Sequence, residues 1–247
     1  MKIAFITPID DLGYDYTDYH MALTHLVLKY PDYAKYYKEL AEAGDFVILD
    51  NSLIELGEAA SLEKVLEAAQ IINPSEIVLP DVFMEGKNTL DAVELALMHV
   101  RNIDQVHNFK FQLQAVCHGE TEDLWKETWN ALQEHADLDT IAIPKVTEKQ
   151  FGSRTPFVKW ALENNHNNKQ IHLLGCWSDM EEFREYTDEM KSKIRGVDTS
   201  ITYHCALDNT DKKPGWKIDL EHNYETDVHK FHKNMLRKQQ EALDIIK

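Results

Sequence analysis

Short apolar runs that end in polar residues recur along the whole chain. In the clearest one, Phe46 to Leu49 lead directly into Asp50, Asn51 and Ser52. A continuous apolar run too short for a helix is typical of a strand buried on both faces in a parallel sheet. Similar runs with polar or reactive ends occupy residues 76–81, 113–118, 141–145, 171–176 and 195–199.

Segments with helical signals alternate with these runs. A helix is predicted from about Tyr33 to Ala43, ended by Gly44 as a left-handed C-cap. Further helices are predicted at 61–72, from about 89, after 119, at 156–163 and at about 221–246. Residues 2–7 are a predicted first strand, and 202–206 form either an eighth strand or a loop. The alternation predicts one α/β domain over residues 1–247, a (β/α)8 barrel of the TIM type.

Two aromatic groups have different expected places in this barrel. The Asp- and Tyr-rich segment 10–20 is predicted to be a loop on the active face, where its rings would cover a planar ligand; an ordinary packed surface loop is the alternative. Trp125 and Trp129 have helical spacing and are predicted to belong to the core.

Composition and charge narrow the class of protein. A hydrophobic content of 43% suffices for a core, and no apolar run approaches the roughly 20 residues that span a bilayer. Three well-separated cysteines and an N-terminus that resembles a strand, without signal-peptide features, predict a cytoplasmic protein with no membrane partner. The net charge of −17 weighs against a broad nucleic-acid footprint, although a local basic rim remains compatible with it.

Three carboxylates stand where predicted strands end. Asp50, Asp81 and Asp198 follow different strands, and a closed barrel would bring them to one mouth. Carboxylate clusters serve acid–base or nucleophilic chemistry on a glycosidic bond, or hold a hard cation. Any single Asp is also explained as a cap of the following helix. Because His118, in the Cys-His-Gly sequence, ends another strand, the pattern favours a functional site.

The same motifs, in order, resemble the tRNA-guanine transglycosylase superfamily, whose members exchange or excise a base at the ribose anomeric carbon. Residues 49–55 lie where that family has Asp-Ser-Gly-Gly-Phe-Gln, and 79–81 resemble its Asp-Glu-Cys segment. Residues 115–120 resemble its Val-Gln-Gly-Gly stretch, 171–175 its Leu-Leu-Gly, and 195–198 its Gly-(Ile/Val)-Asp. The resemblance extends from about residue 46 to residue 200.

This resemblance implies roles for individual residues. Asp198 would be the nucleophile, Asp50 would transfer protons, and Asp81 would read the purine edge with Asn51 or Cys117. Lys145 and Arg154 are candidates for a phosphate or substrate contact, with a surface ion pair as the alternative for Arg154. The full substrate-binding set is Asn51, Ser52, Glu55, Asp81, Cys117, His118, Gly119, Lys145, Arg154, Gly175 and His204.

The chain also departs from that family. The family nucleophile lies three residues past the Gly-Ile-Asp carboxylate, where this chain has Ile201, so either Asp198 has taken the role or nucleophilic catalysis is lost. The family's Cys-x-Cys-x-x-Cys zinc site is absent, and no metal or cofactor is expected. Together with the acidic charge, this favours DNA over tRNA as partner. The closer analogy is the small relatives, often of phages, that insert deazaguanine (queuine-type) bases into DNA.

The expected activity is therefore base exchange at a guanine or 7-deazaguanine glycosidic bond, with a free purine or deazapurine base as second substrate. A homodimer is compatible with the sequence. Three alternatives remain open. One is a metal-dependent barrel hydrolase with Asp50, Asp81 and His204 as ligands; the others are a nucleosidase acting on free nucleosides and a non-catalytic nucleobase-binding barrel.

Overall fold

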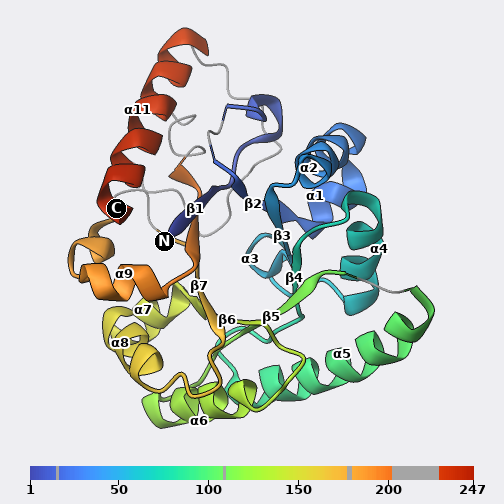
Figure 1. The fold of residues 1–247 in the computed structure, drawn as a ribbon, viewed down its shortest axis with the longest axis vertical. Coiled ribbons are helices and arrows are strands. Elements are labelled where there is room, and N and C mark those ends of the chain that lie inside the picture. Colours follow the sequence, from blue (N-terminus) through green and yellow to red (C-terminus); the bar gives the residue numbers. More distant parts are fainter. Residues whose placement is uncertain (15–16, 108–109, 177–179, 202–227) are drawn as a thin grey trace.

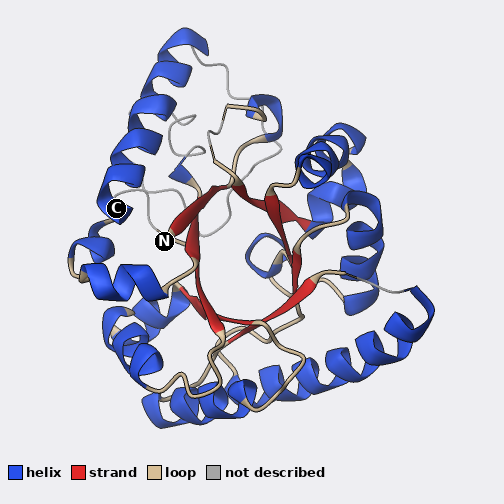
Figure 2. Ribbon diagram, viewed as in Figure 1, coloured by secondary structure: helices blue, strands red, loops and turns tan. Residues whose placement is uncertain are grey.

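The computed structural model describes residues 1–14, 17–107, 110–176, 180–201 and 228–247. Eight parallel strands form one sheet in the order β1-β8-β7-β6-β5-β4-β3-β2, which curls into a nearly closed barrel inside a ring of helices (Figures 1 and 2). The predicted (β/α)8 architecture is thereby confirmed. The strands are β1 Lys2–Phe5, β2 Tyr19–Leu23, β3 Phe46–Asp50, β4 Glu76–Val78, β5 Gln112–Val116, β6 Thr140–Pro144, β7 Gln170–Leu174 and β8 Gly196–Thr199.

The helices predicted from the sequence are present with small shifts at their ends, and four short helices, Thr24–Lys29, Leu53–Leu56, Val146–Phe151 and Asp188–Lys193, were not predicted. Gly44 has φ of 98° and ends α2 (Pro31–Ala43) in the expected left-handed conformation. The last helix agrees with the prediction over 228–246, whereas 221–227 lie outside the described residues. The α-helices are α1 Thr24–Lys29, α2 Pro31–Ala43, α3 Leu53–Leu56, α4 Leu62–Ile72, α5 Gly86–His107, α6 Glu122–Gln133, α7 Val146–Phe151, α8 Thr155–Glu163, α9 Asp188–Lys193 and α11 Val228–Ile246. Short 3-10 helices are η1 Ile9–Asp11 and η2 Glu181–Arg184.

The second strand corrects the prediction that residues 10–20 form a loop. Tyr19 and His20 begin β2, so the strand at Phe46 is the third strand of the barrel and not the second. The strand that the prediction lacked to complete the set of eight is therefore β2. The alternative location, 202–206, lies outside the described part of the chain. The prediction failed because Tyr19 and His20 read as polar, although both are buried and satisfied: the Tyr19 hydroxyl meets His172, and His20 meets Asp45 at 3.1 Å.

The seam of the barrel lies between β1 and β2, the two ends of the strand order. There the Thr17 hydroxyl donates a hydrogen bond of 3.0 Å to the carbonyl of Ile3. In the part of the chain that the structure describes, the crossover from β1 to β2 contains η1 and no α-helix. The outer ring of helices is therefore interrupted at this seam (Figure 1).

Aromatic packing stabilises the opposite side of the barrel. Trp125 and Trp129 on α6 are buried and stacked, with ring centroids 5.8 Å apart, and Phe157 of α8 meets Trp125 edge-on at 5.0 Å. The prediction that these tryptophans belong to the core is confirmed. None of the helices described here has the length and apolar character needed to cross a membrane.

Candidate active site

A strained turn after β3 places Asp50 at the mouth of the barrel. Ser52 has φ of 63°, in the left-handed region that a buried non-glycine residue adopts only when its surroundings enforce it. Its backbone N–H donates to Oδ2 of Asp50 at 2.6 Å, and its hydroxyl accepts the N–H of His25 at 3.3 Å. From α1, the Thr24 hydroxyl donates to the carbonyl of Asp50 at 2.7 Å. The Asp50 carboxyl is thus held at a fixed place while one oxygen, Oδ1, stays unengaged by these bonds.

Asp81, after β4, is held from both neighbouring strands. Nδ2 of Asn51 donates to Oδ1 of Asp81 at 2.6 Å, and Nε2 of His118 lies 2.6 Å from Oδ2. The N–H of Met84 points at Nδ1 of His118 over 3.4 Å, so the imidazole proton sits on Nε2 and is donated to Asp81. Asp50, Asp81 and His118 therefore come together as the sequence predicts, at the ends of β3, β4 and β5.

Asp198, at the end of β8, is held through one oxygen only. Its Oδ1 accepts the backbone N–H of Gly175 at 2.8 Å and lies 3.1 Å from Nε2 of His172. Gly175 has φ of 77°, and this turn after β7 aims its N–H at the carboxylate. Oδ2 accepts no hydrogen bond from the residues that the structure describes. It is the oxygen left for a ligand or a reaction.

The carboxylates at the mouth perturb one another. Burial raises the pKa of Asp50 well above its usual range, and the negative charges of Glu55, Asp198 and Asp81 raise it further. Burial, with the charge of Asp198, also raises the pKa of Glu55 on α3 to about 7. Both shifts favour the protonated form of these carboxyls, and Glu55 changes its charge near neutral pH. A raised pKa is what a general acid requires.

Several predicted ligand contacts are engaged inside the protein. Both amide hydrogens of Asn51 are used, one by Asp81 and one by the carbonyl of Leu79 at 2.8 Å. The Cys117 thiol donates to the carbonyl of Trp125 on α6 at 3.5 Å, and burial raises its pKa well above the usual range. Gly119 permits close packing of α6, because a Cβ there would lie 2.3 Å from the Trp125 nitrogen. Of the residues predicted to contact the base, Asp81 and His118 are the two that form a hydrogen-bonded pair at the mouth.

Arg154 and Lys145 form a separate charged cluster after β6. Arg154 is fully buried; its guanidinium donates to both carboxylate oxygens of Glu182 and to the carbonyls of Ile143 and Leu174. Lys145 lies 2.7 Å from Glu148 and 3.3 Å from Glu182. Arg154 is thus in an ion pair, as the alternative had it, but a buried one. It connects η2 to the ends of β6 and β7.

His172 is the site residue that the sequence reasoning did not single out. It occupies the middle of β7, within a run interpreted as a plain buried strand. A histidine at an inward position two residues before the end of a barrel strand was the available signal. His204 lies outside the described residues, and Ile201 is buried in the core.

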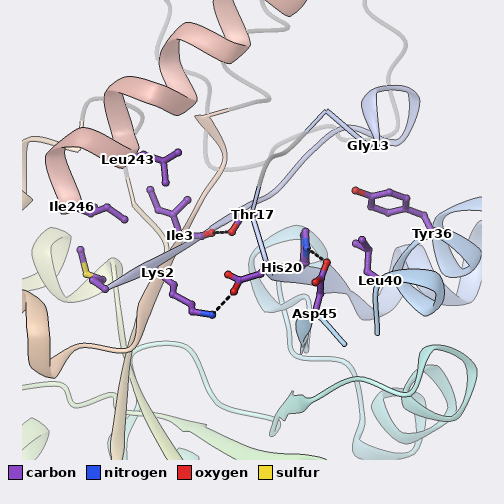
Figure 3. A pocket seen from close by; sticks show the side chains of 12 residues that line it. Lys2, Ile3, Gly13, Thr17, His20, Tyr36, Leu40, Asp45, Leu243 and Ile246 are labelled. Atoms are coloured by element: carbon purple, nitrogen blue, oxygen red, sulfur yellow. Dashed lines mark hydrogen bonds and ion pairs between the residues drawn. The ribbon is translucent and has the colours of Figure 1, made fainter. Parts of the chain in front are cut away.

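A surface groove of the barrel contains none of these carboxylates. It lies on the outside of the β1–β2 seam, beside residues that begin strands and beside α2 and α11 (Figure 3). Lys2 pairs there with Asp18 at 2.8 Å, and His20 with Asp45. Because strand beginnings lie at the end of the barrel opposite the mouth, this groove contains none of the predicted site residues.

Two further findings bear on identity. Within the described ranges, no three His, Cys, Asp or Glu side chains are grouped so that they could hold a metal ion. Compared with models of known protein families and with curated proteins, the sequence matches neither a family model nor a curated relative. The function must therefore be argued from the site itself.

Proposed function

We propose that this protein is a base-exchanging transglycosylase that acts on a guanine or 7-deazaguanine N-glycosidic bond in nucleic acid, with DNA as the favoured substrate. The observation that carries the proposal is the contrast between two carboxyl groups at one mouth. Asp198 has one oxygen held by two hydrogen bonds and one oxygen open, whereas burial and acidic neighbours raise the pKa of Asp50. A nucleophile and an acid are the two groups that this chemistry needs.

The proposed reaction has two balanced steps. Oδ2 of Asp198 attacks the anomeric carbon and forms a C–O bond, while the C–N bond to the base breaks and its electron pair stays on the base. Asp50 gives its proton to the leaving base. An incoming free base then attacks the same carbon through its ring nitrogen, the C–O bond breaks, and Asp198 is regenerated. The N–H proton of the incoming base returns to Asp50.

Asp81 is assigned to base recognition. Its two oxygens each accept one hydrogen bond from the protein, from Asn51 and His118, and each keeps a second lone pair. A carboxylate held in this way accepts hydrogen bonds from the N–H groups of a guanine edge without moving. The ordered resemblance of the strand-end motifs to tRNA-guanine transglycosylases supports this assignment of Asp81. The absence of that family's Cys-x-Cys-x-x-Cys motif from the sequence supports DNA over tRNA as the substrate.

Isotope exchange tests the proposal. Guanine-containing single-stranded and duplex oligonucleotides and a tRNA would each be incubated with the protein and radiolabelled guanine or 7-deazaguanine. We expect label in DNA, none with Asp198→Asn, and normal incorporation with the matched Asp91→Asn, which alters an exposed residue of α5. Release of base from free nucleosides alone would replace the proposal with a nucleosidase.

A non-catalytic base-binding barrel is the second candidate, because buried Ile201 occupies the position of the family nucleophile. Base binding by wild-type protein, unchanged in Asp198→Asn and without any exchange or release, would establish that alternative.

A further inference from the structure

A line of polar side chains crosses the barrel interior from its amino-terminal end to Asp198. It begins with an ion pair between Arg195, just before β8, and Glu76 of β4, at 2.5 Å. The Thr140 hydroxyl donates to the same Glu76 at 2.7 Å, and Arg195 also donates to Thr140 at 2.9 Å. TIM-barrel interiors are usually filled by branched apolar residues, so a fully buried carboxylate in this layer requires an explanation.

The line continues toward the mouth through two aromatic residues. Nε of Arg195 donates to the Tyr19 hydroxyl at 3.0 Å, and that oxygen lies 2.9 Å from Nδ1 of His172. Nε2 of His172 lies 3.1 Å from Oδ1 of Asp198. All of these side chains are buried or nearly so, which excludes water as a competing partner for most of them.

The direction of each hydrogen bond follows from the arginine. A guanidinium only donates, so the Tyr19 oxygen accepts from Arg195 and its own proton is free to go to Nδ1 of His172. Nδ1 is then an acceptor, and the neutral imidazole carries its proton on Nε2, facing Asp198. Burial lowers the pKa of His172, while the charges of Asp198 and Glu76 raise it and Arg195 lowers it. The hydrogen bond that Nδ1 accepts from Tyr19 and the burial of the ring both favour the neutral form with its proton on Nε2.

We propose that Tyr19 and His172 are positioning residues for the nucleophile. The Tyr19 hydroxyl holds the His172 proton on Nε2, and that proton, with the Gly175 N–H, fixes Oδ1 of Asp198 so that Oδ2 is the attacking oxygen. This inference rests on the proposed function. It also explains why an ion pair is buried in the barrel, since Arg195 sets the direction of every bond above it.

The two donors also orient the carboxylate for attack. Donation to one oxygen leaves the other in a fixed direction, as an attack on the anomeric carbon requires.

The test combines two measurements on the full chain. The first is the nitrogen chemical shifts of ¹⁵N-histidine-labelled protein, with the His172 signals assigned by their loss in His172→Gln. We expect the neutral Nε2–H form between pH 6 and 8, and a changed ratio of tautomers in Tyr19→Phe. An Nδ1–H form or an imidazolium in wild-type protein would overturn the inference, whether or not the protein is active.

The second measurement is the single-turnover rate of covalent adduct formation with a guanine-containing duplex, together with the KM for that duplex. We expect His172→Leu to lower the rate about tenfold to a hundredfold with little change in KM, the size expected for a lost hydrogen bond to a charged group. His172→Gln, whose amide can donate from the same place, restores most of the rate.

The outcomes separate the two proposals. If wild-type protein forms no adduct, the proposed function fails, and the tautomer measurement still decides whether His172 presents its proton to Asp198. If His172→Leu lowers the melting temperature but leaves the rate of the folded fraction unchanged, the polar line is purely structural and the inference is wrong.

Discussion

Replacing Glu55 by Gln should make the protein more stable at alkaline pH and leave its stability at acid pH unchanged. The pKa of Glu55 is raised from 4.5 to about 7 in the folded protein by burial and by the charge of Asp198. Between these two values the folded state binds more protons than the unfolded state, so stability falls as pH rises from 4.5 to 7. Above pH 7 the folded protein carries the full cost of ionising this carboxyl.

The size of the effect follows from the shift. Each unit of pKa shift is worth about 1.4 kcal/mol, so the raised pKa of Glu55 lowers the free energy of unfolding by roughly 3 kcal/mol above pH 7. Because Glu55 is only partly shielded from solvent, we expect a measured gain of about 1–3 kcal/mol for Glu55→Gln at pH 8.

Urea unfolding at pH 4.5, 6, 7 and 8 measures this difference in the free energy of unfolding. Glu58→Gln is the matched control, since it changes an exposed glutamate a few residues along the chain and should show no such dependence. A difference between wild type and Glu55→Gln that stays constant across this range would refute the electrostatic account of the mouth.

Three other substitutions test separate parts of the account. Arg154→Met removes the bidentate partner of the buried Glu182 carboxylate and leaves Lys145, 3.3 Å away, as its remaining cation, so we expect a loss of about 3 kcal/mol in urea unfolding. A loss of substrate binding at unchanged stability would instead favour the substrate contact predicted from sequence. Asp81→Asn should weaken binding of free guanine by about tenfold or more in calorimetry, whereas unchanged affinity would exclude Asp81 from base recognition. Gly119→Ala forces a Cβ against the Trp125 nitrogen and should lower stability by about 1–3 kcal/mol in the same unfolding assay; a neutral result would show that α6 can shift.

The barrel was predictable because its signal is local. Buried parallel strands read as continuous apolar runs, and a polar residue directly after such a run marks the carboxyl-terminal face of the barrel, as at Asp50. The sequence did not predict the strand at Tyr19 because its first two side chains are polar, and because no α-helix separates it from β1 within the described residues. Its polar groups are satisfied by partners distant in sequence, which no local pattern shows.

The candidate site was predictable in its carboxylates but not in their connections. The hydrogen bond between Tyr19 and His172 joins residues 153 positions apart, and spacing along the chain carries no trace of it. Arg154 was predicted to contact substrate because it follows a strand. In the structure it pairs instead with Glu182, which lies 28 residues further along the chain. The role of a side chain whose partner is distant in sequence can be assigned only when the fold is known.

The central claim is that Asp198 forms a covalent bond to the sugar. Its most direct test is intact-protein mass spectrometry after rapid quenching of wild type and Asp198→Asn with a guanine-containing oligonucleotide. The account predicts a wild-type species with the mass of protein plus oligonucleotide minus the base, absent from Asp198→Asn and discharged by added free base. Base exchange that proceeds with no such species, or an adduct that persists in Asp198→Asn, would contradict it.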